Sequence, residues 1–227
     1  MTRYLVIFDC DGTLVDSQHL IVAAMEQAFN AVRQPPPRRD AILGVVGLSL
    51  PEAIWRLTSG ADEATVNRIS DGYKTAFGDL RQDPDHWEPM YDGAHDCVTA
   101  LAGDDRFVLG IATGKSQRGV ARVLERYELQ GRFETIQTAD DAPSKPHPGM
   151  IERALAETGA EKAHTVMIGD TTFDMEMARN AGVAGIGVSW GYHPHEHLHA
   201  EVSHGVADDY AHLMRILRAH FDARSVE

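Results

Sequence analysis

An uninterrupted apolar run near the N-terminus leads directly into two carboxylates. Residues 5–8 read Leu-Val-Ile-Phe, and Asp9, Asp11 and Gly12 follow. A run that is apolar at every position is typical of a strand buried on both faces, as in a parallel sheet covered by helices. Ligands of such sheets bind beyond the carboxyl ends of the strands, so the aspartates lie where chemistry is expected. Taken alone, the stretch is also compatible with a simple strand-ending turn.

Apolar strands and amphipathic helices alternate from residue 91 onwards. Strands are predicted over 107–112, 133–136, 165–169 and 184–188. Helices are predicted over 93–102, 148–158 and 208–219, with two more that end near residues 127 and 181. This alternation implies right-handed crossovers and a parallel sheet. The strand ends that carry Asp9, Thr113 and Asp170 are therefore expected to share one edge of the sheet.

The segment between the first strand and residue 87 has helical periodicity and no convincing strand. Helices are predicted from Ser17 to about Val32, and over 40–46, 51–58 and 62–81. Three consecutive prolines, Pro35 to Pro37, break the pattern because proline is excluded from helix interiors. A linker is expected near Pro84 to Pro89, where Pro and Asp cluster.

Composition narrows the class of protein. The 227 residues suit one α/β domain, or a domain that carries a smaller insertion, and no apolar run approaches the ~20 residues that cross a bilayer. Asp9 interrupts the first apolar stretch, so no signal peptide is expected. The two cysteines, Cys10 and Cys97, form no metal-type pair, which favours a reduced, cytoplasmic protein. A formal charge of −13 disfavours nucleic acid as a partner, and a phosphate substrate would need a bound cation and local bases.

Two further segments carry candidate functional residues, the first of which suits phosphate binding. Thr113 and Gly114 stand at a strand end before a helix, where a hydroxyl and backbone N–H groups suit a phosphate oxygen. Thr113 or Ser116 capping that helix is the alternative. Lys145 is followed by Pro146, and the flanking prolines restrict its backbone.

A third segment offers two more carboxylates. Asp170 follows a strand, and Asp174, four residues later, faces the same side of the next helix. Asp170 is a candidate metal ligand. Thr171 and Asp174 also match a variant capping box, so a structural role for Asp174 is the alternative, and both roles can coexist.

Taken together, these motifs resemble those of a known superfamily. Residues 9–17, Asp-Cys-Asp-Gly-Thr-Leu-Val-Asp-Ser, closely resemble the first motif of the haloacid dehalogenase-like phosphohydrolases, and the other motifs follow in order. Within the superfamily, the chain looks most like the phosphoglycolate phosphatase and β-phosphoglucomutase group. The resemblance implies a Rossmann-like α/β core (1–16 and 88–227), with helices on both faces of a parallel sheet. It also implies an all-helical cap (17–87) inserted after the first strand.

The resemblance further implies a mechanism with Mg²⁺. The Asp9 carboxylate, the Asp11 carbonyl and Asp170 would bind the ion, with Asp174 binding directly or through water. Asp9 would be the nucleophile and Asp11 the acid and base. Thr113, the Gly114 amide and Lys145 would hold the phosphate, whereas Lys115 is less clearly assigned and can point to solvent.

The resemblance also assigns the cap to substrate choice. Residues 44–49 resemble the loop that the family's cap points into the site, which makes Gly47, Leu48, Ser49 and Arg56 candidate substrate contacts. Structural roles are the alternative: glycine breaks a helix, Ser49 caps the next one, and Arg56 is an exposed base.

A histidine-rich segment at 193–199 is not explained by these motifs. Clustered histidines can bind a metal or respond to pH, or can simply form an exposed loop.

The function expected from the sequence is Mg²⁺-dependent hydrolysis of a small phosphorylated metabolite through an aspartyl-phosphate, with 2-phosphoglycolate as the leading substrate. A β-phosphoglucomutase-like transferase and a pyrophosphatase of the same fold stay open. A catalytically silent binding protein is the alternative from another class. The sequence does not indicate an oligomeric state.

Overall fold

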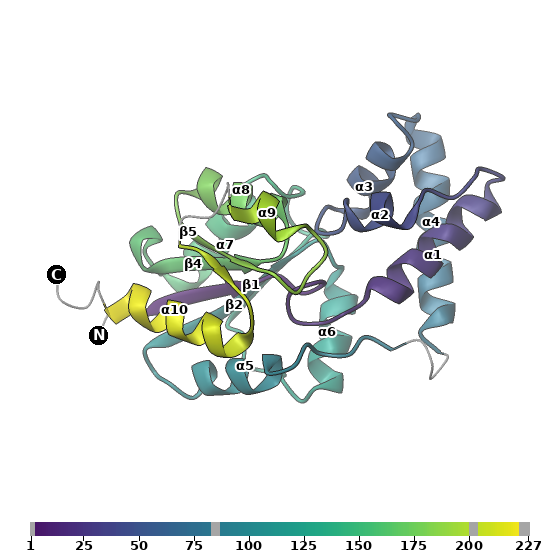
Figure 1. The fold of residues 1–227 in the computed structure, drawn as a ribbon. Coiled ribbons are helices and arrows are strands. Elements are labelled where there is room, and N and C mark those ends of the chain that lie inside the picture. The colour runs from purple at the N-terminus through teal and green to yellow at the C-terminus, as the bar shows by residue number, and fades with distance from the viewer. Residues whose placement is uncertain (1–2, 83–86, 200–203, 223–227) are drawn as a thin grey trace.

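A parallel sheet forms the centre of the α/β core. The computed structural model describes residues 3–82, 87–199 and 204–222. Within them, six strands lie in the order β3-β2-β1-β4-β5-β6, and every neighbouring pair is parallel (Figure 1). Their bounds are β1 (Tyr4–Phe8), β2 (Phe107–Thr113), β3 (Thr135–Thr138), β4 (Thr165–Gly169), β5 (Ala184–Val188) and β6 (Val206–Ala207). The predicted parallel sheet is confirmed, and β6, only two residues long, was not predicted.

Strand register brings the predicted site residues to one edge. Phe8 on the central strand β1 is paired with Ile111 of β2 on one side and with Ile168 of β4 on the other. Asp9 follows Phe8 directly, and its N–H donates to the Ile168 carbonyl at 2.9 Å. The carboxyl ends of β1, β2 and β4 therefore end at about the same level.

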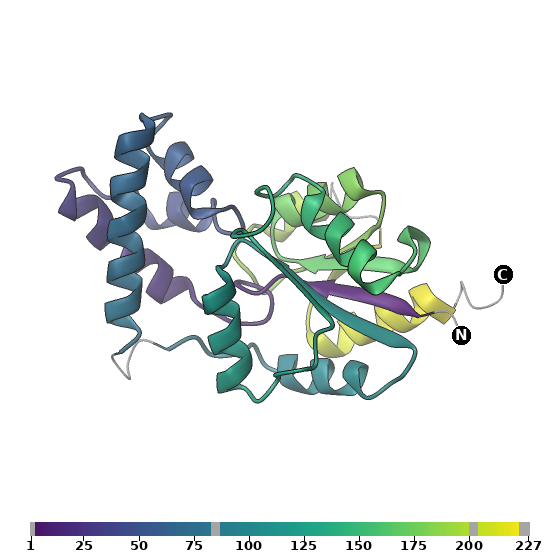
Figure 2. The same ribbon diagram turned by 180° about the vertical axis from the view of Figure 1, so that it is seen from behind.

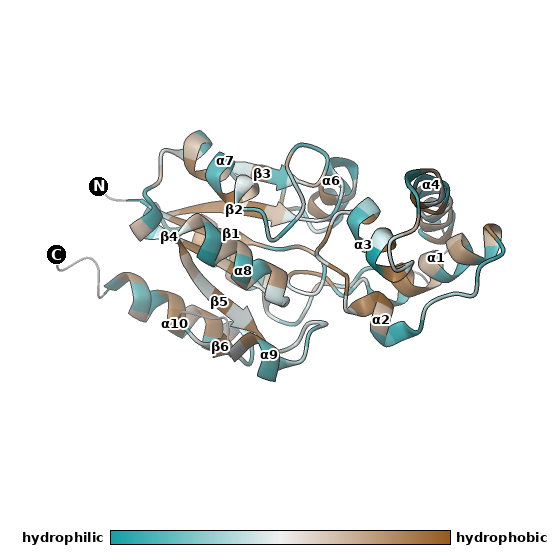
Figure 3. Cartoon of the chain, turned by 90° about the horizontal axis from the view of Figure 1, so that it is seen from above, coloured by the Kyte–Doolittle hydropathy of each residue, from teal (hydrophilic) through white to brown (hydrophobic). Residues whose placement is uncertain are grey.

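Helices cover both faces of the sheet. One face packs against α5 (Ala94–Ala102), α6 (Gln117–Arg126) and α10 (Tyr210–Asp222), and the other against α7 (Gly149–Thr158) and α8 (Thr172–Ala181). Alternate β1 residues explain this: Val6 and Phe8 join the first hydrophobic cluster, and Leu5 and Ile7 join the second. Figure 2 shows the same layers from behind, and Figure 3 shows hydrophobic residues concentrated along the central strands.

The segment after β1 folds into helices with a hydrophobic core of their own. They are α1 (Gln18–Ala31), α2 (Arg39–Leu43), α3 (Leu50–Leu57) and α4 (Glu63–Leu80). Met25, Phe29, Ile42, Ile54 and Ile69 are buried together between them. In Figure 1 this helical region stands beside the carboxyl edge of the sheet, away from both termini. The predicted helical cap is therefore present, whereas its exact boundaries at 17 and 87 stay a prediction.

Several element bounds differ from the sequence prediction. β3 begins two residues later than expected, because its pairing with β2 starts at Thr135, whereas Phe133 packs into the core outside the strand. α2 ends at Leu43, and the residues after it form the turn that reaches the core. Two short helices were not predicted, the 3-10 helix η1 (Lys162–His164) and α9 (His195–His199). Part of the linker expected at Pro84 to Pro89, residues 83–86, lies outside the described residues.

None of the helices within the described ranges combines the length and the apolar character that crossing a lipid bilayer requires.

Candidate active site

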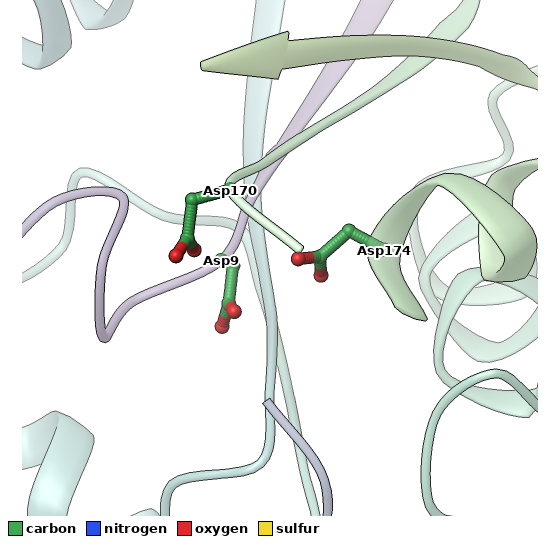
Figure 4. Close-up of side chains that lie close together, drawn as sticks. All are labelled: Asp9, Asp170 and Asp174. Atoms are coloured by element: carbon green, nitrogen blue, oxygen red, sulfur yellow. The ribbon is translucent and has the colours of Figure 1, made fainter. Parts of the chain in front are cut away.

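Three buried carboxylates meet at the carboxyl edge of the sheet. Asp9 follows β1, Asp170 follows β4, and Asp174 lies in the first turn of α8. Each has no exposed surface, and one oxygen from each lies within 4.8 Å of the others. Figure 4 shows the three carboxyl groups gathered at this edge, Asp9 from the first strand and the other two from the later part of the chain. The structure thus brings together three of the predicted metal ligands.

Backbone and hydroxyl donors orient two of these carboxylates. The Cys10 N–H donates to Asp9 Oδ1 at 2.6 Å. The Thr13 hydroxyl donates to Asp170 Oδ1 at 3.0 Å, and the Tyr192 N–H donates to Asp170 Oδ2 at 2.8 Å. Because Thr13 lies in the loop after β1 and Tyr192 in the loop after β5, Asp170 is held from both sides. Sequence reasoning did not find these two residues.

Lys145 links Asp9 to Asp174. Its Nζ lies 2.9 Å from Asp9 Oδ2 and 2.6 Å from Asp174 Oδ1, and its side chain is fully buried. The other Asp174 oxygen accepts from the Thr171 N–H at 3.1 Å and from the Thr171 hydroxyl at 2.6 Å. The proposed capping box is therefore present. Asp174 thus caps α8 and orients Lys145 at the same time.

The charges of the cluster are unbalanced, and the pKa values reflect this. Burial raises the pKa of Asp9 to about 7, although Lys145 opposes the rise. Burial, and then the negative charges of Asp174 and Asp9, raise the pKa of Asp170 well above its ordinary value. Burial also opposes the charge of Lys145, but Asp174 and Asp9 outweigh it and raise the pKa of this lysine. When all three carboxyl groups are ionised, a single ammonium leaves an excess of negative charge in the cluster.

These residues fit a divalent cation. Asp9 Oδ2 is buried, and beyond its ion pair with Lys145 it accepts no hydrogen bond from the described residues. Oxygen ligands in a negatively charged cluster are the type that hard divalent cations prefer. A buried acidic cluster suited to a metal ion is therefore present.

Two glycines let the chain pass close to Asp170. Gly12 has φ +83°, and a Cβ there would lie 2.2 Å from Asp170 Oδ2. A Cβ on Gly191 would lie 2.1 Å from Asp170 Cβ. Both distances are far shorter than van der Waals contact, so a side chain at either position would displace this carboxylate.

Asp11 is held by two side chains whose roles were not predicted. Its Oδ1 accepts from the Ser17 hydroxyl at 2.6 Å and from Lys115 Nζ at 2.8 Å. Ser17 directly precedes α1, and its side chain makes no capping hydrogen bond to that helix, because its hydroxyl is directed to Asp11 instead. The suggestion that Lys115 points to solvent is wrong, because only 6% of its side chain is exposed. The sequence carried no signal for the direction of either side chain.

The predicted phosphate-binding residues lie beside Asp9 and beneath the cap loop. Thr113 is buried, its hydroxyl oxygen accepts from the Lys115 N–H at 3.2 Å, and it lies close enough to Asp9 to lower the pKa of that carboxyl. A Cβ on Gly114 would lie 2.4 Å from the Leu48 carbonyl oxygen and 2.7 Å from that of Gly47. The absence of a side chain at Gly114 therefore allows the cap loop to reach this edge of the sheet.

The four candidate substrate contacts of the cap separate into two groups. Gly47 and Leu48 lie against the core, and the Ser49 N–H donates to the Ser144 hydroxyl at 2.8 Å. The Ser49 side chain makes no capping hydrogen bond to α3. Arg56 instead lies on α3, where it pairs with Glu52 at 2.9 Å and 39% of its side chain is exposed. The guanidinium of Arg56 also lies 5.2 Å from the ring centre of Phe173.

A cavity of about 1220 Å³ lies between cap and core. Asp11, Gly114 and Lys115 line it from the core, and Gly47, Leu48 and Ser49 line it from the cap. Asp9 has no exposed surface, so the cap and the loops around the site cover it in this arrangement.

The described side chains of the histidine-rich segment do not form a cluster that could hold a metal. His193 Nδ1 accepts from the Thr172 N–H at 3.3 Å, and the next histidines lie in α9. The side chain of His199 lies outside the described residues. Across the part of the chain that is described, the three aspartates are the cluster with ligand atoms close enough to share a metal. A metal-binding role for these histidines is therefore not supported.

The fold and the site together define a class of protein, the capped hydrolases with a carboxylate active site. The class combines a parallel α/β core, a helical cap after the first strand, and a buried Asp-Lys cluster at the strand ends. The chain belongs to the family of haloacid dehalogenase-like hydrolases, whose sequence model matches residues 6–188. The predicted resemblance is thereby confirmed, and the chain is an enzyme of the family's phosphatase type.

Individual relatives agree with this family. The chain is 34% identical over 214 residues to the protein named "Probable phosphatase IndB" from Dickeya dadantii, with 92% of this chain and 91% of that protein covered. It is 31% identical over 194 residues to pyrophosphatase PpaX from Anoxybacillus flavithermus, covering 85% and 86%. The crystal structure of a hydrolase from Pseudomonas syringae superposes with a TM-score of 0.82 at 26% identity, covering 98% and 99%.

Proposed function

We propose that this enzyme is a Mg²⁺-dependent phosphatase that hydrolyses a small phosphomonoester through an aspartyl-phosphate on Asp9. The observation that carries the proposal is the fully buried Asp9, with Oδ2 paired to Lys145 and Asp170 and Asp174 beside it. A carboxylate with no catalytic role is ordinarily found at the surface, where water stabilises its charge. A nucleophile that attacks an anionic phosphoryl group needs neighbouring positive charge.

The metal would be held by the Asp9 carboxylate, the Asp11 backbone carbonyl and Asp170. Both oxygens of Asp174 already accept hydrogen bonds, from Lys145 and Thr171, which favours contact through water for this residue. When bound, Mg²⁺ supplies positive charge that offsets the carboxylates and the transferring phosphoryl group.

Different side chains carry out the attack, the proton transfer and the stabilisation of charge. An Asp9 oxygen attacks phosphorus in line with the leaving oxygen, forming the P–O bond to Asp9 while the ester P–O bond breaks. The Asp11 carboxyl donates its proton to the leaving oxygen and takes a proton from the water that later attacks the phospho-Asp9. Lys145, the Thr113 hydroxyl and the Gly114 amide stabilise the negative charge of the phosphoryl oxygens.

Substrate choice is proposed to lie with the cap loop, where Gly47, Leu48 and Ser49 line the cavity. We keep 2-phosphoglycolate as the first substrate to test. Hydrolysis of inorganic pyrophosphate is the second candidate, because a relative that matches 85% of this chain is named a pyrophosphatase.

The test is phosphate release from a panel that contains 2-phosphoglycolate, sugar phosphates, 4-nitrophenyl phosphate and pyrophosphate, with Mg²⁺ or with EDTA. Asp9→Asn is the matched control, because it keeps the size of the side chain and removes the nucleophile. We expect Mg²⁺-dependent hydrolysis that Asp9→Asn abolishes. Isomerised sugar phosphate as the product would indicate a transferase, and absence of turnover across the panel would overturn the proposal.

A further inference from the structure

Lys115 joins two carboxylates at the boundary between cap and core. Its Nζ lies 2.8 Å from Asp11 Oδ1 and 2.6 Å from Glu88 Oε1, and the Lys115 and Glu88 side chains are each 6% exposed. The second Glu88 oxygen lies 2.8 Å from Arg81 Nη2, at the C-terminal end of α4 in the cap. The Lys115 ammonium also lies 5.5 Å from the ring centre of Phe77, again in α4. A charge array, formed by Arg81, Glu88, Lys115 and Asp11, therefore runs from the cap to the active site.

This array occupies one oxygen of Asp11 and leaves the other unoccupied. Both Lys115 and Ser17 donate to Oδ1, and no described residue donates a hydrogen bond to Oδ2. Asp11 lines the cavity between cap and core. Since a carboxylate with one oxygen fixed by two donors cannot rotate freely, its second oxygen has a defined direction. Oδ2 is then the oxygen that can exchange a proton with a substrate in the cavity.

The helix that follows Lys115, α6, has a glycine where the lysine side chain packs against it. A Cβ on Gly119, in the first turn of α6, would lie 2.8 Å from Lys115 Cγ and 3.2 Å from its Cε. Glycine in a helix costs up to about 1 kcal/mol relative to alanine. Here it leaves space for the lysine to fold back along the helix towards Asp11. An alanine would occupy that space.

We infer that Lys115, anchored by Glu88, is a positioning residue that aims Asp11 Oδ2 at the leaving group. The inference rests on the proposed function, because it assigns Lys115 a role in the proton transfer by Asp11. Lys115 Nζ pairs with the Asp11 carboxylate and with Glu88, and with none of the metal-binding carboxylates of Asp9, Asp170 and Asp174. Loss of Lys115 should therefore slow the hydrolysis of substrates whose leaving group must be protonated. It should have little effect on substrates whose leaving group departs as a stable anion.

The experiment compares Lys115→Met and Gly119→Ala with the wild type. Values of kcat/KM are measured for the alkyl phosphate that the wild type hydrolyses fastest, and for 4-nitrophenyl phosphate. This parameter reports events up to loss of the leaving group. Lys162→Met is the matched control, because Lys162 is exposed and lies before β4, at the opposite end of that strand from Asp170.

For both variants we expect kcat/KM on the alkyl phosphate to fall about 10-fold or more, within the range that general acids contribute. The value for 4-nitrophenyl phosphate should change less than about threefold, since its leaving group needs little protonation. Glu88→Gln should shift the ratio of the two values in the same direction. Lys162→Met should leave both values unchanged.

Equal losses on both substrates, or no loss on either, would overturn the role of Lys115. If Lys115→Met does not fold, Gly119→Ala decides the question, because it keeps every charge and favours the helix while displacing the lysine. Failure of the wild type to hydrolyse any phosphoester would instead refute the proposed function. The two failures are therefore distinguishable.

Discussion

Lys145→Met should destabilise the protein in a way that depends on pH. The substitution keeps the approximate length of the side chain and removes the ammonium that lies 2.9 Å from Asp9 and 2.6 Å from Asp174. Removing one partner of a buried ion pair costs about 3–5 kcal/mol, because the remaining charge is left uncompensated. We expect a loss of this size in the free energy of unfolding at pH 8 without divalent cations.

The sign of the pH dependence follows from the Asp9 pKa. Burial raises it from 3.8 to about 7, which corresponds to about 4 kcal/mol of stability lost when this carboxyl ionises in the folded protein. For a carboxyl with a raised pKa, stability is fully present below the unfolded value and is lost as pH rises towards the folded value. Removing Lys145 raises the folded pKa further. The extra destabilisation is therefore largest at pH 8 and smaller, by about 1 kcal/mol or more, at pH 5.5, where Asp9 is protonated in both proteins.

Urea unfolding of the wild type and Lys145→Met at pH 8 and pH 5.5, with EDTA, measures these differences. Lys162→Met serves as the control, since an exposed substitution changes stability by no more than about 0.5 kcal/mol. A loss below about 1 kcal/mol at pH 8, or the same loss at both pH values, would refute the reasoning that Lys145 compensates buried carboxylates.

Three further results are expected. Mg²⁺ should raise the melting temperature more at pH 8 than at pH 5.5, because protons compete for Asp9 and Asp170, and Asp170→Asn should remove that increase. Gly191→Ala should weaken Mg²⁺ binding in calorimetry about 10-fold or more, because its Cβ would displace Asp170. Gly114→Ala should raise KM while the folded spectrum is kept, because its Cβ would lie 2.4 Å from the Leu48 carbonyl and move the cap loop; an unchanged KM would contradict this contact.

Much of the fold could be predicted because the hydrophobic pattern of each segment matches its burial in the folded protein. Residues 5–8 are apolar throughout because β1 is central and covered on both faces, and β4 and β5 were predicted with their observed bounds for the same reason. β3 was misplaced by two residues, because strand ends depend on pairing with β2, which periodicity does not report. β6 and α9 were missed because segments this short have no measurable periodicity.

The sequence by itself determined which residues stand at the strand ends, because a buried strand followed by a polar residue identifies its own end. Asp9, Thr113 and Asp170 were placed in this way, and the tertiary structure brought them to one edge. Only the tertiary structure decided what holds these groups. Lys115 lies 104 residues from Asp11, and Tyr192 lies 22 residues from Asp170. No local pattern specifies such partners, because the direction of a long side chain is set by the space and charge that distant segments provide once they have packed.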